Sequence, residues 1–182
     1  MLKNTGNDYG LIAILLHWLV AIAIFGLFGM GLWMTGLDYY DPWYQRAPDL
    51  HKGIGALLLI VIGLRLAWRL GNPVPRAEAT SSQMERRLAR FAHGLLYLLP
   101  FAVMIAGYLI STADGRPIDV FGLFEIPATL SGLDEQEDVA GLVHEVLAFT
   151  LIGLIALHAL AALKHHFIDR DRTLRRMLGR KR

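Results

Sequence analysis

The chain has 182 residues, of which 54% are hydrophobic and 19% are charged, with a formal net charge of +2 and no cysteine. A soluble domain has about a quarter of its residues charged, so this deficit of charge argues against a soluble fold. The lack of cysteine excludes disulfide frameworks, zinc–thiolate sites, iron–sulfur clusters and covalently attached c-type haem, which needs a C-x-x-C-H motif.

The apolar residues fall into four blocks, at about 11–34, 50–70, 91–113 and 139–163. A helix needs about 20 residues to span a hydrocarbon core about 30 Å thick, and these runs lack the alternation of barrel strands. We therefore predict an all-α fold, an integral membrane four-helix bundle, as a single domain over residues 1–182. The first block is longer than the apolar part of a signal peptide and no small-residue cleavage site follows it, so we expect it to be retained.

Basic residues set the expected orientation. Of the 18 Lys and Arg residues, 15 lie at the N-terminus, around the connection between the second and third blocks, or in the tail. The positive-inside rule then places both the N- and C-termini in the cytoplasm, and we expect a multi-pass protein of a bacterial inner membrane. The basic tail, residues 167–182, has two interpretations: a helix lying on an anionic leaflet, or a solvated topology signal. Apolar residues within 114–138 suggest that part of this outer segment packs on the bundle.

Five of the seven histidines lie within the expected helices, where an ionisable side chain at membrane depth is costly and marks a functional site. His144 and His158 are 14 residues apart, roughly 21 Å along a helix and within about 40° of the same face. His51 lies at the outer level of His144, and His17 lies at the inner level of His158. This geometry predicts two pairs, His17 with His158 and His51 with His144. His93, about 5 Å past the last basic residue before it, fits the interface better than a deep site.

Two opposed imidazoles in an apolar core fit a b-type haem, which takes one axial imidazole on each face of its ring. Zinc has three or four protein ligands, and a proton relay would favour Asp and Glu, which are nearly absent from these blocks. We therefore predict two bis-histidine b haems at two levels. Four glycines close to these histidines in sequence could open room for the rings or serve helix packing: Gly53, Gly55, Gly141 and Gly153.

Basic residues near the two levels are candidates for binding haem propionates. Arg65 lies 14 residues after His51, which places it at the inner level, and Arg69 follows one turn later. The alternative for both arginines is that they extend to the lipid headgroups. At the outer level the candidates are Lys52 and Arg116.

The chain resembles the bacterial cytochrome b-561 family over nearly its whole length. The matching stretches are LHWL at 16–19, LHKGIG at 50–55, RLAWR at 65–69 with the following NP, FGL at 121–123 as far as Pro127, VHE at 143–145, LHALAALKHH at 157–166 and TLRRM at 173–177. The resemblance implies a four-helix inner-membrane protein with two b haems that exchanges electrons with the quinone pool. It also implies oxidation of superoxide at the outer face, where Arg116 and Lys52 would attract the anion, and reduction of ubiquinone near the inner haem. The candidates for the quinone site are His165, Lys164 and His93.

Three functions stay open at this point. The chain is a superoxide:ubiquinone oxidoreductase, a membrane cytochrome b subunit that links quinone to a soluble redox enzyme such as a hydrogenase or dehydrogenase, or a non-redox membrane protein such as a transporter. The expected partners are the quinone pool, superoxide or a redox partner protein, and membrane lipid, with no nucleic acid. No catalytic residue is assigned from the sequence.

Overall fold

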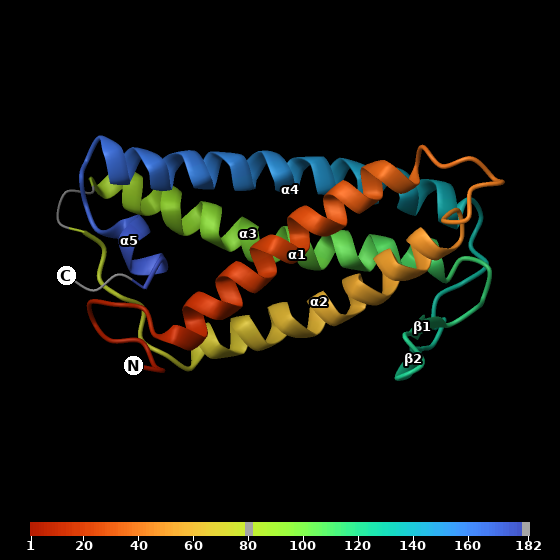
Figure 1. Cartoon of the computed structure of the whole chain (residues 1–182), viewed down its shortest axis with the longest axis horizontal. Coiled ribbons are helices and arrows are strands. Elements are labelled where there is room, and N and C mark those ends of the chain that lie inside the picture. Colours follow the sequence, from red (N-terminus) through yellow and green to blue (C-terminus); the bar gives the residue numbers. More distant parts are fainter. Residues whose placement is uncertain (79–81, 180–182) are drawn as a thin grey trace.

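The computed structural model describes residues 1–78 and 82–179. Its elements in chain order are α1 (Leu11–Met34), α2 (Arg46–Leu70), α3 (Gln83–Ser111), β1 (Ile118–Val120), β2 (Phe124–Ile126), α4 (Gln136–Phe167) and α5 (Thr173–Met177). Four long helices lie along one axis, with the segments before α1 and after α4 at one end and the β1–β2 hairpin at the other (Figure 1). We call these the terminal end and the hairpin end.

The helices α1 to α4 are each long and apolar enough to cross a membrane, which confirms the predicted all-α membrane bundle. The bounds of α1 agree with the apolar block, whereas α2, α3 and α4 extend beyond theirs by several polar residues. The largest extension is in α3, where Ser82 and Glu85 form a reciprocal capping box at the helix start. Apolar blocks therefore mark the part of each helix that crosses lipid, while the caps decide where the helix begins.

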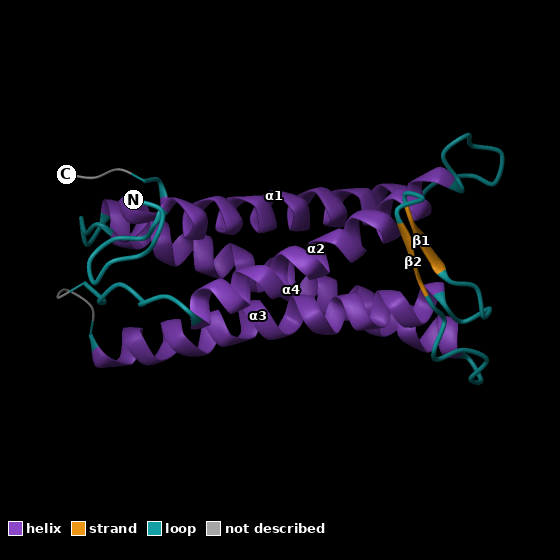
Figure 2. Ribbon diagram, turned by 90° about the horizontal axis from the view of Figure 1, so that it is seen from below, coloured by secondary structure: helices purple, strands orange, loops and turns teal. Residues whose placement is uncertain are grey.

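The bundle consists of two helix pairs. The helix α3 packs closely along α4, and α1 packs along α2, with α2 also touching α3. Figure 2 shows the same helices from a second direction. A small buried core of Val20, Leu58 and Ile62 joins α1 and α2, and Tyr97 and other partly buried residues of α3 pack against it. Leu58 lies seven residues from His51 and seven from Arg65, so this core lies between the two levels that carry the histidines.

The outer segment between α3 and α4 packs on the bundle, as its apolar residues suggest. The strands β1 and β2 are antiparallel, with Val120 opposite Phe124, and Val120 is fully buried. The turn between them places Phe121 and Gly122 at positive φ angles of 57° and 68°. The ring of Phe121 then lies against α2, where a side-chain carbon at Gly53 would be 2.6 Å from its Cζ atom. A side chain at position 53 would have to displace this ring.

The C-terminal tail packs on the terminal end of the bundle. Neither interpretation of the basic tail from the sequence, a helix on an anionic leaflet or a solvated topology signal, included this packing. The tail contains the short helix α5, and its residues 180–182 lie outside the described residues. The contacts that hold it include a hydrogen bond from the Trp18 indole N–H to the Met177 carbonyl (2.9 Å) and ion pairs that join Arg172 to Asp8 (2.9 Å) and Arg176 to Glu78 (2.7 Å).

Candidate functional site

Two pairs of imidazoles face one another between the helix pairs. At the hairpin end, His51 of α2 lies opposite His144 of α4, with ring centroids 6.1 Å apart. At the terminal end, His17 of α1 lies opposite His158 of α4, with centroids 6.3 Å apart. The helix α4 therefore presents one imidazole to α2 and one to α1, at two levels roughly 21 Å apart.

The spacing within each pair suits one iron atom between two axial ligands. A metal–imidazole nitrogen bond is about 2 Å long and the ring centroid lies about 1 Å further out, so two opposed ligands place their centroids about 6 Å apart. The two imidazoles of each pair come from helices that are not closely packed, because α4 makes its extensive backbone contacts with α3 and not with α1 or α2.

His144 is held in one orientation by α3. Its Nδ1 donates to the carbonyl of Val103 at 2.8 Å. The ring lies against Gly107, where a side-chain carbon would be 3.2 Å from both Cε1 and Nδ1 of the imidazole. An Nδ1 that carries the hydrogen leaves Nε2 as the nitrogen for a metal, which is the usual arrangement of a histidine ligand.

His51 is positioned less completely. Its Cε1 lies 3.6 Å from where a side-chain carbon of Gly31 would be, so α1 also leaves space for this ring. Its Nδ1 is buried and has no hydrogen-bond partner among the described residues. A buried nitrogen without a partner costs about 1–3 kcal/mol.

The glycines that touch the imidazoles are not those that sequence proximity suggested. Gly53 contacts Phe121, and a side-chain carbon at Gly55, Gly141 or Gly153 would meet no described atom within 4 Å. Gly55 and Gly141 lie on the same helix faces as His51 and His144, one turn away, so protein side chains do not fill those faces beside the rings. The unfilled space beside the imidazoles suits the flat macrocycle of a haem.

His93 lies deeper than the sequence analysis expected. Its ring centroid is 5.3 Å from that of His158, so a third imidazole accompanies the terminal-end pair. The expectation was wrong because it took Arg90 as the edge of the lipid, whereas Arg90 lies within α3 and the structure places His93 beside His158. The basic residues before His93 belong to the helix and do not mark its start.

Arg65 lies at the terminal-end pair, while Arg69 does not touch it in the contacts described. The Nη2 of Arg65 donates to Nδ1 of His17 at 2.9 Å. Both guanidinium groups lie over the ring of Tyr97, at 5.1 Å for Arg65 and 5.8 Å for Arg69. These cation–π contacts hold two positive charges within the membrane-spanning part of α2.

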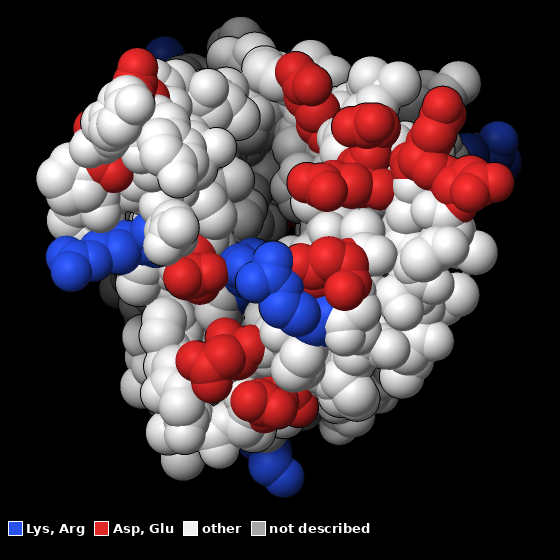
Figure 3. Space-filling view, turned by 90° about the vertical axis from the view of Figure 1, so that its right-hand side faces the viewer, with Lys and Arg blue, Asp and Glu red and all other residues white. Residues whose placement is uncertain are grey.

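The two basic candidates at the hairpin end are both paired with carboxylates. Lys52 Nζ lies 2.9 Å from an oxygen of Asp49, and Arg116 pairs with Asp114. The hydrogen bond from Arg116 holds the pKa of Asp114 below its usual value, so this carboxylate stays charged. Figure 3 shows that acidic side chains surround the basic ones on this face. The face therefore presents negative charge.

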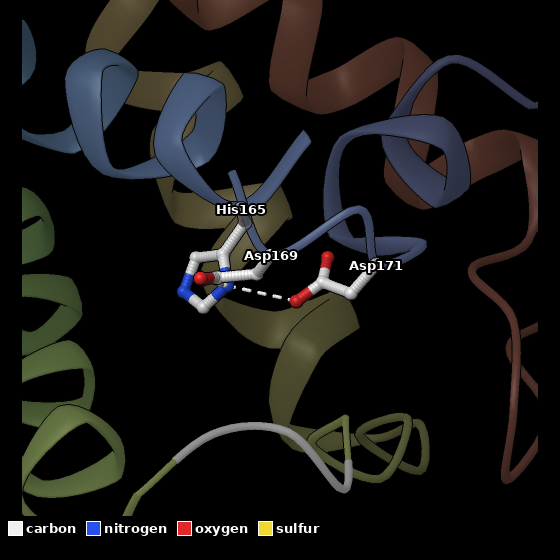
Figure 4. A group of neighbouring side chains, drawn as sticks. All are labelled: His165, Asp169 and Asp171. Carbon is white, nitrogen blue, oxygen red and sulfur yellow. Dashed lines mark hydrogen bonds and ion pairs between the residues drawn. The ribbon is translucent and has the colours of Figure 1, made fainter. Parts of the chain in front are cut away.

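A second polar cluster lies at the terminal end, just after α4 (Figure 4). The Nδ1 of His165 lies 3.0 Å from Asp169 Oδ2 and 2.8 Å from Asp171 Oδ2. Lys164 Nζ is 2.9 Å from the same oxygen of Asp169 and 2.7 Å from Glu85 of α3. One ligand atom from each of His165, Asp169 and Asp171 falls within 4.8 Å of the others, a spacing that a metal ion could bridge. Sequence analysis missed both aspartates, because a turn outside the helical period brings them to His165.

Comparisons with known proteins bear on what these side chains hold. Residues 8–180 match the family described as Prokaryotic cytochrome b561. The chain is 52% identical to Cytochrome b561 homolog 2 of Escherichia coli K12 over 97% of this chain and 94% of that protein. It is 32% identical to Probable superoxide oxidase CybB of Yersinia pestis over 97% and 98% of the two chains. It is 28% identical to Cytochrome b561 homolog 1 of Escherichia coli K12 over 97% and 99%.

A match over nearly the whole chain identifies the family and its chemistry. Two opposed imidazoles, a fixed Nδ1–H at His144 and open helix faces beside the rings all fit the macrocycle. The chain therefore belongs to the prokaryotic cytochrome b561 family, whose members transfer electrons across a membrane with b-type haem, and it is a multi-pass membrane protein of that family.

Proposed function

We propose that this chain carries electrons across a bacterial inner membrane, between a donor at the hairpin end and ubiquinone at the terminal end. His51 and His144 would hold one b haem, and His17 and His158 a second. The observation that carries the proposal is the repeat of one arrangement at two levels of α4, with imidazole centroids 6.1 Å and 6.3 Å apart. When bound, the haem irons supply reversible one-electron chemistry on both sides of the lipid core.

Arg65 would serve the terminal-end haem by binding one of its propionates. It donates to Nδ1 of His17, an arrangement that requires Nδ1 to be an acceptor. An imidazole that binds metal through Nε2 carries its hydrogen on Nδ1 and no longer accepts. Arg65 would then be free to bind a carboxylate such as a haem propionate, with Arg69 as a second cation one turn away. At the hairpin end Lys52 and Arg116 have the same candidate role, in competition with their own carboxylate partners.

The quinone would be reduced at the terminal end, which the positive-inside rule places in the cytoplasm. The candidates for its site are His93, whose ring adjoins that of His158, and His165 and Lys164, which lie seven and six residues further along α4. Conversion of a quinone to a quinol takes two protons as well as two electrons. His165 is the histidine of this group that already lies in a network of proton donors and acceptors, so we assign it the relay of protons from the cytoplasm.

The donor at the hairpin end has two candidates. The name of the Yersinia pestis relative supports superoxide, which loses one electron to become dioxygen and needs no proton donor. A membrane subunit that accepts electrons from a soluble enzyme is the second candidate, and the charge of this face favours it. Lys52 and Arg116, the two cations expected to attract superoxide, are paired with Asp49 and Asp114 on a negative face. Negative charge repels superoxide and attracts a positively charged protein.

Mixing the oxidised holoprotein with a pulse of superoxide in a stopped-flow spectrometer tests the proposal. If superoxide is the donor, the haem α band rises faster than spontaneous dismutation consumes the superoxide. A slow rise with superoxide, together with copurification of a soluble redox enzyme that reduces the haems quickly, would select the subunit function. A purified protein without Soret and α-band absorption, from cells supplied with iron, would overturn the electron-transfer proposal altogether.

A further inference from the structure

The segment after α4 turns back and brings two carboxylates to one nitrogen of His165. Arg170 adopts a positive φ of 54°, and Ile168 and Asp169 still donate backbone hydrogen bonds to the last turn of α4. The turn places Asp169 Oδ2 and Asp171 Oδ2 at 3.0 Å and 2.8 Å from Nδ1, and the two aspartates approach the imidazole together in Figure 4. The side chain of Asp171 is only 3% exposed, and that of His165 is 18% exposed.

The carboxylate of Asp171 is ionised and accepts hydrogen bonds. Burial alone would raise the pKa of Asp171, but the backbone N–H of Thr173 and the imidazole of His165 both donate to this carboxylate and hold its pKa below the usual value. An ionised carboxylate can only accept, so the hydrogen that lies between it and the imidazole belongs to Nδ1. The same hydrogen occupies Nδ1 whether the imidazole is neutral or charged. Protons can therefore enter and leave this ring only at Nε2.

We propose that Asp171, assisted by Asp169, is a positioning residue that commits Nε2 of His165 to carrying protons to the quinone. This inference rests on the proposed reduction of ubiquinone at the terminal end. The two electrons come from the donor of the proposed electron transfer, and the two protons come from cytoplasmic water. His165 gives up a proton from Nε2 to a quinone oxygen, takes another from water at the same atom, and repeats the step. An acid group fixed by a carboxylate in this way resembles the orientation of a catalytic histidine by aspartate.

The other charged groups around His165 support this role. Lys164 lies between Asp169 and Glu85 of α3, with distances of 2.9 Å and 2.7 Å, and so offsets part of the negative charge of Asp169. On α2, Arg65 and Arg69 lie over the ring of Tyr97. Asp171 is thus the carboxylate whose negative charge acts most strongly on the imidazole of His165. The ammonium group of Lys164 also supplies the positive charge that a metal ion would bring to Asp169, so the cluster is satisfied without a metal.

The test compares Asp171→Asn with the wild-type holoprotein. Haems are reduced with dithionite, and their reoxidation by short-chain ubiquinone is followed by stopped flow between pH 5.5 and 9. Asparagine removes the negative charge beside Nδ1, so the proton at Nε2 is lost at lower pH. The midpoint of the rate against pH should shift to lower pH, and the rate at pH 8 should fall at least about tenfold. Asp8→Asn is the matched control, because Asp8 binds Arg172 at the same end without touching His165. Its profile should not move.

A second measurement does not depend on activity. Nitrogen-15 spectra of histidine-labelled protein, with the His165 signals assigned by His165→Gln, should show the hydrogen on Nδ1 in the wild type and a mixture of tautomers in Asp171→Asn. If Asp171→Asn does not bind haem normally, Asp169→Asn takes its place with a smaller shift in the same direction.

Three results would overturn the inference: an unchanged pH profile and tautomer in both variants, the same shift in Asp8→Asn, or loss of the wild-type rate on adding EDTA, which would mean that the cluster holds a metal. Failure of the proposed function looks different, because wild-type haems would then not be reoxidised by quinone at any pH.

Discussion

The imidazole of His144 depends on atoms of α3 more than on its own helix. The carbonyl of Val103 fixes Nδ1, and the missing side chain of Gly107 leaves room for the ring. Hydrogen-bond partners of this kind set the tautomer and the orientation of a metal ligand, and their loss usually weakens metal binding by 10–100-fold. The residue that shapes this site is therefore a glycine with no chemistry of its own.

Gly107→Val should release the hairpin-end haem and leave the terminal-end haem bound. A side-chain carbon at this position lies 3.2 Å from two atoms of the imidazole, so the added methyl groups push the ring away from its position opposite His51. The matched control is Gly94→Val, since a side-chain carbon at Gly94 meets no described atom within 4 Å. Pyridine haemochrome analysis should give about one haem per chain for Gly107→Val and about two for Gly94→Val. Two haems in both variants would contradict the role of Gly107.

At the scale of single residues, the sequence predicted which imidazoles face one another but not which residues of neighbouring helices contact them. A 14-residue interval fixes the faces and levels of His144 and His158, because helix geometry converts residue number into position. Contacts with Gly31 and Gly107 depend on how neighbouring helices rotate and slide, which no interval within one helix contains. His93 was placed too shallow for a related reason, since its level beside His158 depends on how α3 lies against α4.

Among the elements, the basic tail has a charge pattern that fits two different environments. Alternating basic and apolar residues suit a leaflet surface, and they equally suit the end of a helical bundle that offers carboxylates. The partners Asp8 and Glu78 lie about a hundred or more residues earlier in the chain, so nothing in the local pattern distinguishes the two. The structure docks α5 on the bundle and ties the tail to α1 through Trp18, the neighbour of His17.

Arg176→Ala should lower the thermal stability of the holoprotein. The side chains of Arg176 and Glu78 are 11% and 20% exposed, and removal of the arginine leaves a mostly buried carboxylate without its ion pair. The cost of such an unpaired group is about 1–3 kcal/mol. Each kcal/mol lowers the melting temperature of a protein of this size by about 2–4 °C.

The control is Arg175→Ala, which removes an exposed arginine of the same short helix. This variant should melt within about 1 °C of the wild type. Equal melting temperatures for the two variants, followed by circular dichroism in detergent, would show that the Arg176 pair does not stabilise the tail.

The whole molecule separates two pairs of imidazoles along its length. The helix α4 carries an imidazole near each end, and the buried core of Val20, Leu58 and Ile62 lies between the levels. The helices α1 and α2 then each complete one level, so a single bundle supplies two sites with the same ligand set and different surroundings. Acidic side chains surround the hairpin-end level, while Arg65 and a third imidazole accompany the terminal-end level. An uneven arrangement of this kind suits transfer between two different redox partners.

Replacing one ligand at each level should separate the two halves of the electron path. His51→Ala should keep the terminal-end haem, which quinol still reduces, and should lose reduction by the donor at the hairpin end. His17→Ala should keep the hairpin-end haem, which the donor still reduces, but quinone should no longer reoxidise it. Each variant should contain about half of the wild-type haem, because two imidazoles from different helices hold each group independently of the other pair. Reduction by a superoxide pulse and reoxidation by short-chain ubiquinone, followed at the α band, measure the two halves separately. If either single variant lost both haems, or if both variants still passed electrons from the donor to quinone, the two-level path across the bundle would be wrong.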